Sequence, residues 1–124
     1  MMKKKVLLID DDKTLCDVTK ALLHQTMKYQ VTTAQAGEVG IQLARKIMPD
    51  VILLDIKMPG MDGGRVAESL GEDASTNSIP IIFLTGLISQ DEVDRQGGYI
   101  GGHPFIAKPF DVKKLTDMIE SVTA

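Results

Sequence analysis

The chain of 124 residues is long enough for one domain with its own hydrophobic core, and its composition, 44% hydrophobic and 25% charged, is ordinary for a globular protein. A net charge of -3, from 14 basic and 17 acidic residues, argues against nucleic-acid binding as its main role. Cys16 is the only cysteine and no apolar run approaches the roughly 18 residues that span a bilayer, so we exclude a disulfide framework, a thiolate metal cluster and a transmembrane segment, and expect a single cytoplasmic domain over residues 1–124.

The first two predicted elements are a buried strand and an amphipathic helix. Lys5 to Ile9 (KVLLI) is a continuous apolar run, which predicts a strand covered on both faces. Three acids follow it, and Asp12 is suited to cap the next helix. From Thr14 to about Met27, apolar residues recur at helical spacing, with Cys16 expected to be a buried small hydrophobe. The predicted helical face consists of Leu15, Val18, Leu22 and Leu23.

The middle of the chain repeats this alternation. Tyr29 to Ala34 (YQVTTA) predicts a strand at a sheet edge. Pro49 ends the following helix, and Val51 to Asp55 (VILLD) predicts a second fully buried strand. The segment from Pro59 to Gly63 (PGMDG) imposes a turn before the third helix begins. The predicted faces of the second and third helices consist of Val39, Leu43, Ala44, Ile47, Val66, Ala67 and Leu70.

The last part of the chain predicts two further strands and two helices. Ile79 to Leu84 (IPIIFL) and Phe105 to Ala107 are the apolar runs. Ser89 and Glu92 have the spacing of a capping box for a short fourth helix, and Asp111 is suited to cap the fifth. The stripe of that final helix consists of Leu115, Met118, Ile119 and Val122. Five alternating strand–helix units predict an α/β domain, with a parallel sheet covered by helices on both faces.

Polar side chains end four of the predicted strands. Asp10 and Asp11 follow the first strand, Asp55 ends the third, Thr85 follows the fourth and Lys108 the fifth. Because the carboxyl ends of parallel strands meet at one edge of a sheet, these side chains should converge. Converging carboxylates are costly without a cation, and hard oxygen ligands favour Mg²⁺. A lysine and a threonine opposite them could hold a phosphoryl group on Asp55, with the carboxylate as nucleophile.

Each of these residues alone also fits a structural role. Asp55 could be a solvated strand end, Thr85 an ordinary strand residue and Lys108 a surface lysine. Phe105, in the last strand, could simply supply buried area. Their expected convergence at one edge of the sheet favours the functional interpretation.

Four ordered motifs carry a resemblance to a known family. IDDD at Ile9 to Asp12, LLDIKMPGMDG at Leu53 to Gly63, FLTG at Phe83 to Gly86 and AKPF at Ala107 to Phe110 resemble the receiver domain of bacterial response regulators, over essentially the whole chain. The resemblance implies a flavodoxin-like (βα)5 fold: a doubly wound, five-stranded parallel sheet with strand order 2-1-3-4-5.

The resemblance also implies a phosphorylation chemistry. Asp55 would accept a phosphoryl group from the histidine of a sensor kinase or of a histidine phosphotransfer protein. Asp11 would ligate Mg²⁺ directly and Asp10 directly or through water, while Asp55 and the backbone carbonyl of Lys57 would complete the protein ligands.

Further residues are assigned by the same resemblance. Thr85 and Lys108 would each contact a phosphoryl oxygen, and Gly86 would leave room for the phosphoryl group. Phe105 matches the family's aromatic switch position, where the ring turns inward when the residue matching Thr85 moves toward the phosphoryl group. Family members commonly have a cis bond before the proline that matches Pro109, which here would aim Lys108.

The sequence departs from the family pattern in two places. GGHPF at Gly101 to Phe105 differs from the usual approach to the last strand, which lies on the face that mediates output or dimerisation in the family. The usual mode of a homodimer formed on phosphorylation is therefore not expected to carry over. Lys57 stands two residues past the acceptor, at a position that tunes dephosphorylation in the family. His24 and His103 match no motif position, and we expect neither to be a phosphodonor or a ligand.

We therefore expect a phosphorylation switch in a two-component system, not an enzyme beyond its own phosphorylation and dephosphorylation, acting through a downstream protein or an output module of a longer protein. One alternative is an interaction module that works without phosphorylation. A second is a phosphohydrolase, disfavoured because Lys57 occupies the place where a second acid is needed. A flavin-binding flavodoxin is disfavoured because the first strand–helix loop is acidic where a phosphate-binding loop is needed.

Overall fold

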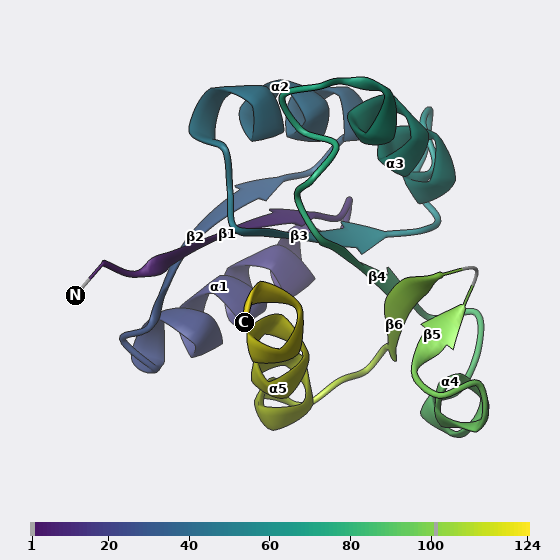
Figure 1. Cartoon of the computed structure of the whole chain (residues 1–124). Helices are drawn as coiled ribbons and strands as arrows, with labels where there is room; N and C mark the ends of the chain where they lie inside the picture. Colours follow the sequence, from purple (N-terminus) through teal and green to yellow (C-terminus); the bar gives the residue numbers. More distant parts are fainter. Residues whose placement is uncertain (1, 101) are drawn as a thin grey trace.

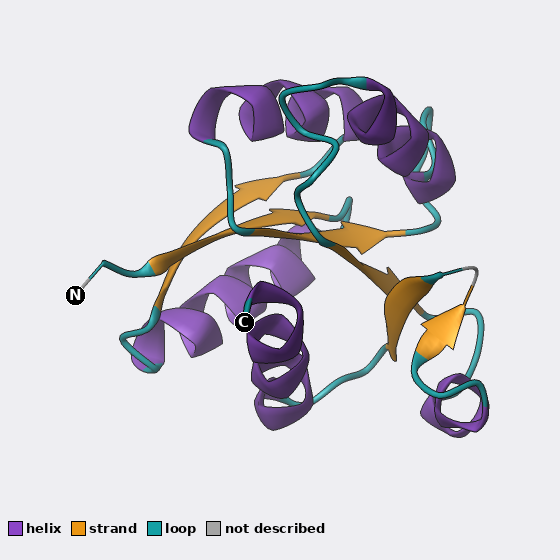
Figure 2. Cartoon of the chain, viewed as in Figure 1, coloured by secondary structure: helices purple, strands orange, loops and turns teal. Residues whose placement is uncertain are grey.

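The computed structural model describes residues 2–100 and 102–124 and contains one sheet between two layers of helices (Figure 1). Figure 2 shows the strands as a twisted surface with helices above and below it. Among the described residues, no helix is both long enough and apolar enough to span a membrane. In chain order the elements are β1 (Lys4–Ile9), α1 (Lys13–Gln25), β2 (Tyr29–Ala34), α2 (Gly37–Ile47), β3 (Val51–Asp55), α3 (Gly63–Glu72), β4 (Ile81–Thr85), α4 (Gln90–Arg95), β5 (Tyr99–Ile100), β6 (His103–Ala107) and α5 (Val112–Thr123).

The parallel part of the sheet confirms the expected flavodoxin-like topology. Its order is β2-β1-β3-β4-β6, which is the order 2-1-3-4-5 because β6 is the fifth parallel strand along the chain. The sequence did not predict β5, which pairs antiparallel with β6 and extends the sheet by two residues. Gly98 directly precedes β5 and Gly102 directly precedes β6, with φ values of 81° and 83°, a conformation that glycine adopts without a steric penalty. Gly101, within the predicted departure from the family, lies outside the described residues.

Alternation along β1 divides the hydrophobic core between the two faces of the sheet. Val6 and Leu8 pack with residues of α1 and α5, whereas Leu7 and Ile9 pack with residues of α2 and α3. All four side chains are fully buried, as the continuous apolar run predicted. The central strands are therefore held rigidly from both sides, which fixes the positions at which they end.

The predicted helix starts are confirmed by their caps. Side chains of Asp12, Ser89 and Asp111 accept hydrogen bonds from the backbone N–H three residues later, at 3.0, 3.2 and 2.7 Å. β4 begins at Ile81, two residues later than predicted, because Pro80 has no N–H for the ladder; its carbonyl still accepts from Ile52 N–H at 3.0 Å.

The predicted faces of α1 and α2 are partly wrong. In α1, Val18 and Leu22 are 52% and 39% exposed, whereas Leu23 and Cys16 are buried as predicted and Thr19 is buried without having been predicted. Small side chains let the helix approach the sheet closely, and the Cys16 thiol donates to the carbonyl of Asp10 at 3.3 Å. In α2, Val39 is also exposed and the buried positions include Ile41 and Ala44. The predicted faces of α3 and α5 are confirmed, since their members are buried or half-buried.

Candidate functional site

The carboxyl ends of four strands bring the predicted site residues together. Strand register places Asp55 opposite Leu84, the residue before Thr85, and Thr85 opposite Ala107, the residue before Lys108. A cavity of about 430 Å³ opens at this edge. It is lined by Asp10, Asp11, Asp12, Asp55, Lys57, Thr85, Gly86, Leu87 and Lys108. Every residue predicted to bind the cation or the phosphoryl group therefore lies in one place.

Three acids in this cavity form a cluster suited to a cation. Asp10, Asp11 and Asp55 each offer one carboxylate oxygen, and these oxygens lie within 4.8 Å of one another. Asp10 and Asp55 are buried, whereas Asp11 is exposed at the mouth of the cavity. A set that consists of carboxylate oxygens alone fits a hard divalent cation such as Mg²⁺. The backbone carbonyl of Lys57 belongs to a residue that lines the same cavity.

Lys108 lies between two of these acids. Its ammonium nitrogen is 2.6 Å from Asp10 Oδ2 and 3.0 Å from Asp55 Oδ1. Its own backbone N–H donates to the carbonyl of Thr85 at 2.7 Å, which ties the base of the side chain to the end of β4. The peptide bond between Lys108 and Pro109 is cis, as the resemblance implied. The Lys108 ammonium therefore bridges the buried carboxylates of Asp10 and Asp55.

The electrostatics of the site follow from burial and incomplete charge balance. Burial raises the pKa of the Asp55 carboxyl; the hydrogen bond from Lys108 opposes this rise and the charge of Asp10 adds to it. Burial by itself lowers the pKa of the Lys108 ammonium, but its hydrogen bonds to Asp10 and Asp55 raise it overall. One ammonium group therefore offsets only part of the negative charge, and an added cation would be favoured.

Thr85 and Gly86 shape the wall opposite the acids. Thr85 is buried, and its hydroxyl oxygen accepts from the backbone N–H of Leu87 at 3.0 Å. The hydrogen of that hydroxyl is then available for an oxygen inside the cavity. A Cβ atom at Gly86 would have no neighbour within 4 Å, so the space beside it is open, as expected for a position that admits a phosphoryl group.

Close packing against α3 fixes the loop that follows Asp55. The N–H of Gly63 donates to the carbonyl of Ile56 at 2.7 Å, and Asp62 caps the helix by accepting from Arg65 N–H at 2.9 Å. A Cβ atom at Gly63 would lie 2.8 Å from Ile56 Cα and collide with the carbonyl of Asp55. Glycine is therefore required here by the close approach of two backbone segments.

An aromatic contact beside the site was not predicted. Phe105 is half-buried and stacks on Phe83, with ring centroids 5.0 Å apart, and Phe83 in turn meets the edge of His103 at 5.2 Å. The spacing of His103 and Phe105 on one strand hints at a shared face, but the sequence does not give the register with Phe83. His24, the other histidine, accepts from Val31 N–H through Nε2 at 3.1 Å and is not among the described residues that line the site.

Comparison with known proteins agrees with this geometry. The family model described as the response regulator receiver domain matches residues 6–120. Protein PilH of Pseudomonas aeruginosa is 36% identical over 121 residues, which cover 97% of this chain and 98% of PilH. Response regulator PleD of Caulobacter vibrioides is 36% identical over 98% of this chain, but the chain spans only 26% of PleD. Among solved structures, chemotaxis protein CheY4 of Vibrio cholerae has a TM-score of 0.81 and 28% identity, and the match covers 98% of this chain and 99% of CheY4.

Proposed function

Because the chain belongs to the response regulator receiver family, we propose that it accepts a phosphoryl group on Asp55 from a phosphohistidine of a sensor kinase or phosphotransfer protein, with a divalent cation, Mg²⁺, bound. The observation that supports this most strongly is the position of Asp55. Its carboxylate is buried at a strand end, hydrogen-bonded to Lys108 and close to two further acids.

The proposed transfer is an in-line displacement at phosphorus. A carboxylate oxygen of Asp55 forms the new O–P bond while the P–N bond to the donor imidazole breaks, and the bonding electron pair stays on the imidazole nitrogen. A cation held by Asp10, Asp11 and Asp55 would neutralise charge on the phosphoryl oxygens.

Two residues of the chain would stabilise the remaining charge. Lys108 would exchange its hydrogen bond with Asp55 for one with a phosphoryl oxygen, and Thr85 would donate its hydroxyl hydrogen to another. The Thr85 hydroxyl can donate while its oxygen still accepts from Leu87 N–H, but a movement of Thr85 toward the phosphoryl group would break that bond to Leu87. We infer that this movement, followed by Phe105, converts phosphorylation into a change of surface by shifting a pre-existing equilibrium.

The proposed activity ends with the state of Asp55. The chain would promote its own phosphorylation and dephosphorylation without turning over an external phosphoester, and output would come through a downstream protein or an attached module. PilH resembles this chain along nearly its whole length and PleD over only a quarter of its own length, so the family supports both arrangements.

The test is intact mass spectrometry after incubation with acetyl phosphate, with Mg²⁺ or with EDTA. We expect one added phosphoryl group in the presence of Mg²⁺, and none with EDTA or in the Asp55→Asn variant. If acetyl phosphate and a phosphorylated kinase both leave the mass unchanged, the proposal is wrong, and the domain acts as an interaction module without phosphorylation.

A further inference from the structure

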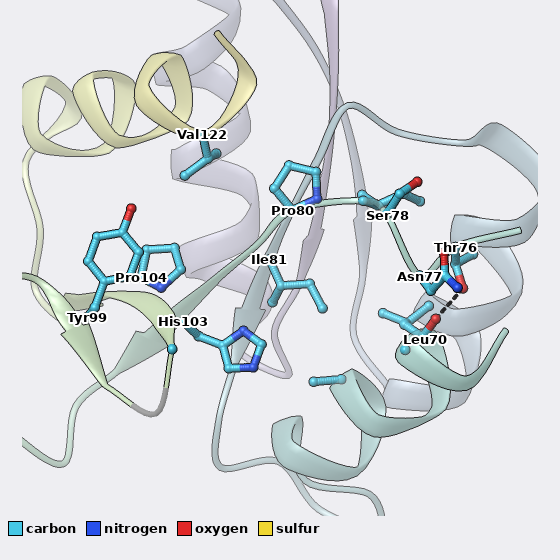
Figure 3. A pocket seen from close by; sticks show the side chains of 14 residues that line it. Leu70, Thr76, Asn77, Ser78, Pro80, Ile81, Tyr99, His103, Pro104 and Val122 are labelled. Carbon is cyan, nitrogen blue, oxygen red and sulfur yellow. Dashed lines mark hydrogen bonds between the residues drawn. The ribbon is translucent and has the colours of Figure 1, made fainter. Parts of the chain in front are cut away.

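A second cavity lies at the opposite edge of the sheet from Asp55. It has a volume of about 350 Å³ and is bounded by the end of α3, the segment that leads into β4, the β5–β6 hairpin and the end of α5. Figure 3 shows His103 beside Ile81 on its wall, with Pro80, Tyr99 and Val122 around it. No Asp, Glu, Lys or Arg is among its described lining residues, which distinguishes this uncharged cleft from the acidic phosphorylation site.

Three aromatic rings lead from this cleft toward the phosphorylation site. The ring of His103 meets Phe83 edge-on, with centroids 5.2 Å apart and planes at 85°. Phe83 stacks on Phe105, with centroids 5.0 Å apart and planes at 26°. Both arrangements are favourable geometries for aromatic pairs, so each ring favours a particular position of the next.

The ring stack runs along part of β6, from His103 at the start of the strand to Phe105 at its middle. His103 is the first residue of β6, and Ala107, at its other end, pairs with Thr85 at the edge that holds Asp55. A strand of five residues spans about 13 Å at roughly 3.3 Å per residue. The stack therefore covers about half of the distance between the cleft and the site, and backbone pairing between β4 and β6 covers the rest.

The middle ring is held more firmly than the outer two. Phe83 is only 5% exposed, whereas Phe105 is half-buried and His103 is exposed on the wall of the cleft. If Phe105 turned inward, Phe83 would lose its stacking partner or follow it, because close-packed interiors respond to displaced groups by repacking. Either response changes the ring that His103 contacts.

We propose that Phe83 and His103 are positioning residues that couple the Phe105 ring, and through it the phosphorylation state of Asp55, to the uncharged cleft. This inference rests on the proposed function, because phosphorylation supplies the movement of Phe105. By reciprocity, anything that fixes His103 also biases the equilibrium that phosphorylation shifts.

The experiment uses the only two histidines of the chain as an internal pair. Proton NMR resolves the imidazole C–H signals, which the His103→Gln variant assigns. The same sample is phosphorylated with acetyl phosphate and Mg²⁺, and intact mass confirms the adduct. We expect the His103 signals to shift on phosphorylation and the His24 signals to stay, because His24 contacts the backbone of β2.

Substitution of the middle ring tests the path. In Phe83→Leu, phosphorylation should shift the His103 signals much less than in wild type. If circular dichroism shows that Phe83→Leu does not fold, Phe83→Met takes its place. An adduct without a His103 shift, or an undiminished shift in the Phe83 variants, would overturn the coupling.

Failure of the proposed function gives a different result, namely no adduct. The stack is then tested in the unphosphorylated protein by a double-mutant comparison. Phe105→Leu should move the His103 signals in the wild-type background and move them less in Phe83→Leu. Equal effects in both backgrounds would also overturn the coupling.

Discussion

Gly63 offers the sharpest test of how the fold positions the acceptor. In Gly63→Ala, the new methyl group would lie 2.8 Å from Ile56 Cα and overlap the carbonyl of Asp55. Both neighbours are backbone atoms of a central strand end, so neither can move aside by a rotamer change. Overpacking of this kind costs about 1–3 kcal/mol, and we expect the free energy of unfolding to fall by about 2 kcal/mol.

Two other glycines of α3 provide matched controls. At Gly64 the methyl group would meet only Asp62 Oδ1 at 3.3 Å, and at Gly71 it would meet nothing within 4 Å. Gly64→Ala should therefore change stability by less than about 0.5 kcal/mol, whereas Gly71→Ala should raise it by about 0.5–1 kcal/mol through helix propensity.

Urea denaturation followed by circular dichroism measures all three variants. With slopes of about 1–3 kcal/mol per molar urea, Gly63→Ala should lower the midpoint by roughly 1 M, while Gly71→Ala should raise it. Equal midpoints for Gly63→Ala and Gly71→Ala would show that the close approach at the Asp55 carbonyl does not constrain the fold.

Three further results are expected from the charges and burial of the site. Burial raises the pKa of Asp55, so the ionised carboxylate destabilises the folded protein at neutral pH. Asp55→Asn should therefore unfold at a higher urea concentration than wild type at pH 7 in EDTA, and this difference should disappear below about pH 4, where Asp55 is protonated in both the folded and the unfolded state. A difference that stays constant with pH would contradict the assigned cause. Lys108→Ala removes the ammonium group that contacts Asp10 and Asp55, and it should slow phosphorylation by acetyl phosphate about 10²–10³-fold. The control Lys113→Ala changes an exposed residue of α5 and should leave the rate unchanged. A small effect of Lys108→Ala would exclude a role of Lys108 in charge stabilisation. Burial raises the pKa of the Cys16 thiol to about 11, so iodoacetamide at pH 8 should modify this thiol in urea and not in the native protein. Rapid modification of the native protein would show that Cys16 is not buried between α1 and the sheet.

The sequence predicted the parallel strands well because their signal is strong. Continuous apolar runs such as Val51 to Asp55 admit few interpretations, and their polar ends converge once the strands are parallel. The site could be predicted from this convergence alone, and the structure does bring Asp10, Asp55, Thr85 and Lys108 together around one cavity.

Other features depend on information that periodicity does not contain. In α1 the sequence pattern correctly predicted that Cys16 and Leu23 are buried, but apolar spacing also favoured Val18 and Leu22, which the fold leaves exposed while it buries the polar Thr19. β5, with only two residues, is too short to give a strand pattern. The contact between Phe83 and its neighbouring rings depends on register between strands, which only the folded sheet defines.

The central claim is that Asp55, rather than one of the three acids near it, receives the phosphoryl group. Sodium borohydride reduces an aspartyl phosphate to homoserine, so the acceptor can be located by peptide mass mapping of protein phosphorylated with acetyl phosphate and Mg²⁺. We predict homoserine at position 55, and only in the phosphorylated sample. Homoserine at position 10, 11 or 12 with Asp55 intact would contradict the account.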